Sequence, residues 1–130
     1  MYNLSMTNTE LLKTGRDMLL GLHKSLVDLS RNEYELQHGK VTSGQFLNAL
    51  LDDENLAWLR KFSALIVDID EMFAQKDGFS DEAVEFHLTN LKNLVGMAGH
   101  GEDFARRYQD AVQRDMDVAA KQGEIKRLFN

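Results

Sequence analysis

Four titratable side chains fall on the apolar faces of predicted helices, namely His23, Asp70, His87 and Asp115. At about 100° per residue, each lies within or beside the hydrophobic arc of its own helix. A buried charge or an unpaired imidazole is unfavourable by several kcal/mol, so such groups need polar partners. Folding each antiparallel helix pair about its connection brings all four to within about one turn of a common level. The sequence therefore predicts one inward polar cluster.

This cluster has two interpretations. In the first, it is a buried hydrogen-bonded network that fixes the register of the helices. In the second, two neutral imidazoles and two carboxylates hold a divalent metal or act as an acid–base pair, as in a hydrolase built inside a helix bundle. The chain has no H-E-x-x-H or H-x-x-x-H spacing. The cluster therefore rests on geometry alone, and no cofactor is expected unless it holds a metal.

A second candidate site lies where the first and third predicted helices should be level with each other. Its members are aromatic, charged or hydroxyl side chains, namely Arg31, Tyr34, Glu35, Trp58, Arg60 and Ser63. They could form a surface pocket in which the two arginines donate to an anion. Alternatively, Glu35 pairs with Arg60 and Tyr34 packs on Trp58, so that the residues only hold the two helices together.

The elements that position these residues are predicted to be helices. Thr7 and Glu10 have the spacing of a capping box, and the leucines that follow predict a helix to about residue 38, closed by Gly39. Thr42 and Gln45 repeat the capping-box spacing and predict a short linking helix. A strict three- and four-residue spacing of apolar side chains predicts the third helix over residues 57–73.

The second half of the chain is predicted to hold two more helices. Ser80 should cap a helix that ends at Gly96, and a glycine-rich loop should follow it. The last helix is predicted over residues 102–122, with a break at Gly123 and a small apolar tail. Because the connections are short, the sequence predicts an all-α fold, an antiparallel four-helix up-and-down bundle with one additional short helix. The chain, 1–130, should be a single helical domain with flexible ends at about 1–6 and 123–130.

Composition excludes several classes of function. The 130 residues include no Cys, which rules out disulfides, thiolate metal sites and thiol nucleophiles. The net charge is -6 and no basic stripe is present, so nucleic-acid binding is not expected. No segment approaches 18 consecutive apolar residues, and the first residues lack the pattern of a secretion signal, so neither membrane insertion nor export is expected. The predicted location is therefore cytoplasmic.

The first predicted helix carries a second apolar stripe, formed by Leu20, Val27 and Tyr34. Together with its main stripe, this makes more than half of the helix circumference apolar. Phe86 also points away from the inner face of its helix. An apolar surface of this kind is typical of protein contacts. We therefore expect a homo-oligomer or a protein partner.

Part of the chain resembles a family of small, uncharacterised bacterial helical proteins. The resemblance spans about residues 18–75 and rests on three segments, namely His23-Lys24, Arg31-x-x-Tyr34-Glu35 and Trp58-Leu59-Arg60-x-x-Ser63-x-Leu65-Ile66-Val67-x-Ile69-Asp70-Glu71. It implies a cytosolic helical bundle and assigns no catalytic role to any residue. The leading hypothesis is therefore an interaction or structural module that self-associates. The alternative is a bundle that binds a metal or a small molecule through the inward cluster.

Overall fold

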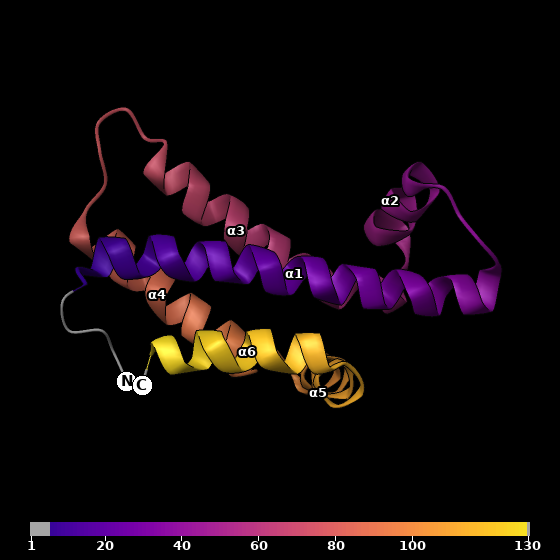
Figure 1. Ribbon diagram of the computed structural model, residues 1–130. Helices are drawn as coiled ribbons and strands as arrows, with labels where there is room; N and C mark the ends of the chain where they lie inside the picture. The colour runs from indigo at the N-terminus through magenta and orange to yellow at the C-terminus, as the bar shows by residue number, and fades with distance from the viewer. Residues whose placement is uncertain (1–5, 130) are drawn as a thin grey trace.

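The chain folds into helices joined by short loops (Figure 1). The structure is a computed structural model that describes residues 6–129. Within this range it contains no strand, and its elements in chain order are α1 (Asn8–His38), α2 (Ser43–Asp52), the 3-10 helix η1 (Glu54–Leu59), α3 (Arg60–Phe73), α4 (Asp81–Val95), α5 (Glu102–Arg114) and α6 (Met116–Leu128). The predicted all-α class is confirmed. The up-and-down four-helix topology stays a prediction.

The long helix α1 is the central element of the fold. Its 31 residues begin after Thr7, whose hydroxyl accepts from the N–H of Glu10, and end before Gly39 at φ 81°. Such a helix is about 46 Å long, and it contacts α3, α4 and α6. In Figure 1, α6 lies alongside α1 and runs in the opposite direction, while α3 and α4 cross it obliquely. None of the helices described within residues 6–129 is long and apolar enough to cross a membrane.

The core lies where α1 meets α3, α4 and α6. The largest fully buried aliphatic side chains come from these four helices and η1, and they are Leu12, Leu19, Leu22, Leu26, Leu59, Ile69, Val84, Leu91, Leu94 and Ile125. Gly15 lets α4 approach α1 closely, since a Cβ atom there would lie 2.5 Å from Cδ2 of Leu91. Of the leucines that predict the first helix, Leu12, Leu19, Leu22 and Leu26 form the centre of the core, whereas Leu29 is partly buried and Leu36 is exposed.

The C-terminal region differs from the prediction. In place of one helix over 102–122, the chain turns at Asp115, whose backbone is extended at φ -134° and ψ 118°. The Asp115 carboxylate accepts from the N–H groups of Asp117 and Val118, at 2.9 and 3.1 Å, and so caps α6. Figure 1 views α5 nearly end-on while α6 lies along α1, so the two helices run in very different directions.

The predicted break at Gly123 is also wrong. Helix α6 continues to Leu128, and both Ile125 and Phe129 are buried. Phe129 lies beside the end of α4, near Val95. The last turns of α6 are therefore held to the core through Ile125 and Phe129 and do not form a loose tail. The expected flexible N-terminal stretch falls, except for Met6, outside the described residues.

Helix α2 lies beside the C-terminal half of α1 (Figure 1). It begins with the predicted capping box, in which the Thr42 hydroxyl accepts from the N–H of Gln45 and the Gln45 side chain accepts from the N–H of Thr42. Only Phe46 and Ala49 of α2 are buried. The predicted third helix is divided, because η1 covers residues 54–59 before α3 begins.

Candidate functional site

The predicted inward cluster does not form one hydrogen-bonded site. Asp70 is half exposed and receives two hydrogen bonds from the guanidinium of Arg16, both 2.8 Å long. Asp115 caps α6. Neither His23 nor His87 bonds to either carboxylate, and residues 6–129 contain no group of three or more His, Asp or Glu side chains that could hold a metal ion.

The two histidines have separate surroundings. The His23 side chain on α1 is half-buried and makes no hydrogen bond within residues 6–129, and burial lowers its pKa. His87 on α4 is half-buried, and its ring lies 5.5 Å from the ring of Phe86. Its Nδ1 atom is shielded from solvent and has no hydrogen-bond partner among the described residues. His87 thus lies near the apolar face as expected, but the other three residues do not surround it.

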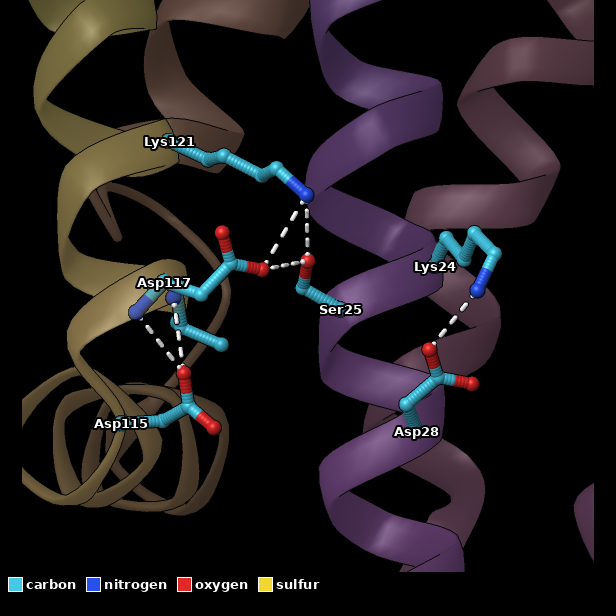
Figure 2. Close-up of polar contacts among 7 residues, drawn as sticks. Lys24, Ser25, Asp28, Asp115, Asp117 and Lys121 are labelled. Carbon is cyan, nitrogen blue, oxygen red and sulfur yellow. Dashed lines mark hydrogen bonds and ion pairs between the residues drawn. The ribbon is translucent and has the colours of Figure 1, made fainter.

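A different polar cluster joins α1 to α6 (Figure 2). The buried hydroxyl of Ser25 donates to the carboxylate of Asp117 at 2.5 Å and accepts from Nζ of Lys121 at 2.7 Å. Lys121 also contacts Asp117 at 3.1 Å. The Ser25 hydroxyl and then the Lys121 ammonium lower the pKa of Asp117. A serine inside the Leu22 and Leu26 stripe was the available sequence signal for this contact.

The contact between Ser25 and Lys121 raises the question of a serine nucleophile activated by lysine. Such a nucleophile needs a free base and a cleft that admits substrate. Here the Ser25 hydroxyl donates to a carboxylate, Lys121 is paired with that same carboxylate, and Ser25 lines neither of the two clefts described below. The cluster of Ser25, Asp117 and Lys121 is therefore interpreted as a structural clamp between two helices.

In the second candidate site, Arg31 and Glu35 hold the loop after α1. Arg31 donates to the carbonyl of Val41 at 2.8 Å, and the Glu35 carboxylate accepts from the N–H of Val41 at 3.0 Å. The guanidinium of Arg60 donates to the carbonyl of Leu51. The predicted pair of Glu35 with Arg60 is therefore wrong. The reason is that the two arginines satisfy backbone carbonyls around α2.

The predicted packing of Tyr34 on Trp58 is also wrong. The Tyr34 ring lies 4.3 Å from His38 and 5.7 Å from Phe46 of α2, measured between ring centroids. Trp58 instead joins an aromatic cluster with Phe62, Phe104 and Tyr108, which sequence reasoning missed. Burial raises the pKa of Tyr108. The four rings come from three elements, η1, α3 and α5, so no local spacing could reveal the cluster. 

Glu35 and His38 have the Glu-x-x-His spacing that occurs in metal-binding helix bundles. In this structure the Glu35 carboxylate bonds to the N–H of Val41 and lies 3.8 Å from Arg31. The His38 ring stacks beside Tyr34. The spacing therefore belongs to the end of α1 and its loop, where each side chain already has another contact.

Two clefts share Trp58 as a lining residue. The α1–α5 cleft, between α1, η1 and α5, has a volume of about 370 Å³, and Tyr34 also lines it. The α3–α5 cleft, between η1, α3 and the start of α5, has a volume of about 510 Å³, and Arg60 also lines it. Of the six residues of the predicted pocket, these three line a cleft. Arg31, Glu35 and Ser63 line neither.

The two clefts differ in charge. The α1–α5 cleft is lined by three carboxylates and one guanidinium, namely Glu33, Asp53, Asp110 and Arg107. The α3–α5 cleft is lined by Arg60, Lys61 and His100 together with Glu54 and Asp103. In the second cleft, Lys61 lies over the ring of Phe104, and both burial and Lys61 lower the pKa of His100.

Comparison of the chain with protein-family models, with curated proteins and with solved structures finds no match. Residues 6–129 therefore form an all-helical fold whose surface carries an acidic cleft and a cleft of mixed charge. The resemblance to a bacterial helical family stays a prediction.

Proposed function

We propose that this protein is an interaction module that self-associates through the outer face of α2. The outer face is defined by the exposed residues Gly44, Leu47, Asn48 and Leu51. Leu47 and Leu51 lie one helical turn apart and expose 56% and 57% of their surface. This pair of exposed leucines is the observation that carries the proposal, because leucines at this spacing form one continuous apolar stripe.

Charge favours a second copy of the chain as the partner. The chain has a net charge of -6, so two copies repel each other over most of their surfaces. The outer face of α2 carries no charge, and Asp52 is the only charged residue in the helix. A two-fold contact places the same patch on both sides, so an uncharged apolar patch can meet itself without like-charge repulsion. The small area of the patch favours a weak, reversible dimer.

The backbone contacts around α2 support this role. Arg31 and Glu35 hold Val41 before the helix, and Arg60 holds the carbonyl of Leu51 near its end. The buried ring of Phe46 fixes its inner face. A helix already held in position loses little conformational entropy on binding. In this proposal the predicted four-helix bundle serves as the scaffold that presents α2.

The second stripe of α1 is a weaker surface for the same role. Leu20 exposes 45% of its surface, but Val27 and Tyr34 are partly buried against the core. Tyr34 is covered in part by Phe46 of α2. Phe86 is exposed, as predicted, but it lies on α4. We therefore place the contact on α2.

The test is the molar mass in solution, measured by light scattering or sedimentation from about 5 µM to 500 µM. We expect the mass to rise with concentration and the Leu47→Glu variant to stay monomeric. The matched control is Met116→Glu, which changes a side chain that is 91% exposed at the start of α6. Circular dichroism checks that both variants keep their helices. A wild-type monomer at every concentration, or equal loss of dimer in both variants, would overturn the proposal.

A further inference from the structure

In the α1–α5 cleft, the hydroxyl of Ser30 makes no hydrogen bond to any of the described residues. Ser30 lines the cleft with only 8% of its surface exposed. The hydroxyls of Ser25 and Ser63 both make hydrogen bonds, whereas the hydroxyl of Ser30 makes none in the described structure. The protein does not fully enclose this hydroxyl oxygen, so it can be reached from the cleft. A ligand in the cleft could supply the missing partner.

The carboxylates of the cleft differ in how far they are neutralised. The guanidinium of Arg114 forms an ion pair with Glu33 and another with Asp110 at 3.3 Å, so both carboxylates have a cationic partner. Asp53 accepts only the N–H of Asn55, at 2.8 Å, and within residues 6–129 it has no cationic partner. Asp53 is therefore the carboxylate that can best accept a new positive charge.

The one guanidinium that lines the cleft does not compete for this role. Arg107 donates from Nε to Asp103 at 3.0 Å, and its two terminal nitrogens donate to the carbonyl and the side chain of Asn55 at 3.1 and 3.2 Å. The guanidinium nitrogens of Arg107 are thus used to join α5 to η1. The cleft consequently favours cations over anions, because its other lining charges are carboxylates.

The remaining walls are apolar and aromatic. Leu29, Leu56 and Trp58 line the same cleft, and so does Tyr34 of α1. Methylene groups pack well on such surfaces, and an ammonium group is attracted to aromatic faces. An ammonium group also carries three donors, which suit a carboxylate and a hydroxyl. A volume of about 370 Å³ is within the range of small-molecule sites.

We propose that the α1–α5 cleft binds an aliphatic amine. The Asp53 carboxylate and the Ser30 hydroxyl accept hydrogen bonds from its ammonium groups, and its methylene stem packs against Trp58. This site does not depend on self-association, because none of its lining residues belongs to the outer face of α2. The two proposals can therefore fail separately.

Trp58 provides the measurement, since it is the only tryptophan in the chain and it lines the cleft. The probe is 1,5-diaminopentane, titrated at pH 7 and low salt while tryptophan emission is recorded, with calorimetry as the second readout. We expect a saturable change that weakens as salt is added, because the contact is electrostatic. The neutral analogue 1,5-pentanediol should bind at least about tenfold more weakly.

Two aspartates next to each other give a matched pair of variants. Asp53→Asn removes the charge while keeping a side chain that caps η1 as well as Asp does, and it should weaken amine binding about tenfold. Asp52→Asn removes an exposed charge that does not line the cleft, and binding should change by less than about twofold. Ser30→Ala should weaken binding about threefold to tenfold through one lost hydrogen bond.

Three results would overturn the amine site. The first is no saturable signal from the diamine up to 10 mM in either readout, a concentration far above an ordinary binding constant. The second is equal binding of the diol and the diamine. The third is equal weakening by Asp52→Asn and Asp53→Asn in variants whose melting temperatures match that of the wild type.

Discussion

The two ends of α1 lie in very different surroundings. All of its buried residues fall between Leu11 and Ser30, and none lies in residues 31–38. The first part packs against α3, α4 and α6. In the last two turns, Tyr34 lies near Phe46 of α2, and Tyr34, Gln37 and His38 line the α1–α5 cleft. One helix thus joins a packed core to an open, polar end.

The two ends are also held together by different forces. Apolar burial dominates the covered end, where Leu12, Leu19 and Leu22 are fully buried. At the open end, arginine and glutamate side chains bond to backbone groups of the loop and of α2. Regions with few buried apolar contacts open more easily, and binding surfaces are commonly found in them. The stable end therefore supports the fold, and the open end carries both proposed interactions.

The largest expected effect tests this division directly. Leu19→Ala removes a fully buried side chain and should lower the free energy of unfolding by about 2–5 kcal/mol. Leu36→Ala makes the same chemical change at a side chain that is 87% exposed, and should change it by less than about 0.5 kcal/mol. Urea denaturation of both variants measures the difference. Similar losses in the two would contradict the proposed division.

A smaller effect is expected when α2 loses its anchor. Phe46 is buried and lies near Tyr34 and the guanidinium of Arg31. Phe46→Ala should lower the local opening free energy of α2 by about 1–3 kcal/mol. Amide hydrogen exchange should accelerate in residues 43–52 and stay unchanged at Leu22 and Ile69. Uniform acceleration across the whole chain would show instead that α2 unfolds only together with the core.

The clamp between α1 and α6 should contribute less. Ser25→Ala removes the hydroxyl that joins Asp117 and Lys121 and should cost about 1 kcal/mol in the free energy of unfolding. Ser43→Ala, at the exposed start of α2, is the matched control and should change it by less than about 0.5 kcal/mol. If Ser25→Ala is as stable as the wild type, the clamp contributes only to helix register.

The sequence predicts the parts of this fold that depend on local contacts. The hydroxyls of Thr7, Thr42 and Ser80 accept the hydrogen bonds expected of helix caps, and α1 ends before Gly39 in a left-handed conformation. These interactions join residues three or four positions apart, so short patterns encode them. The core stripes follow from the same local periodicity.

Long-range partners could not be predicted in the same way. The inward cluster assumed an unbroken last helix, but Asp115 turns the chain, and the acidic pair Asp115 and Asp117 was a cap signal that the periodic pattern obscured. Asp70 pairs with Arg16, which is 54 residues away in the chain. Contacts of this kind depend on how helices cross, which spacing within one helix does not determine.

The smallest expected effect is a pH dependence at the covered end of α1. Burial lowers the pKa of His23 below its ordinary value of 6.5, so the folded state resists protonation more than the unfolded state does. As the pH falls below 6.5 the unfolded chain gains a proton first, and the free energy of unfolding should therefore decrease between pH 7.5 and 5.5. His23→Gln should reduce this decrease, as measured by urea denaturation at several pH values. The pKa values of Asp70 and Asp117 are lowered from 3.8, so their contributions to stability are lost only at more acidic pH.

The control for His23→Gln is His100→Gln, because the pKa of His100 is lowered as well, at the α3–α5 cleft. If only His100→Gln reduces the dependence, the sensitive group lies at that cleft and not in α1.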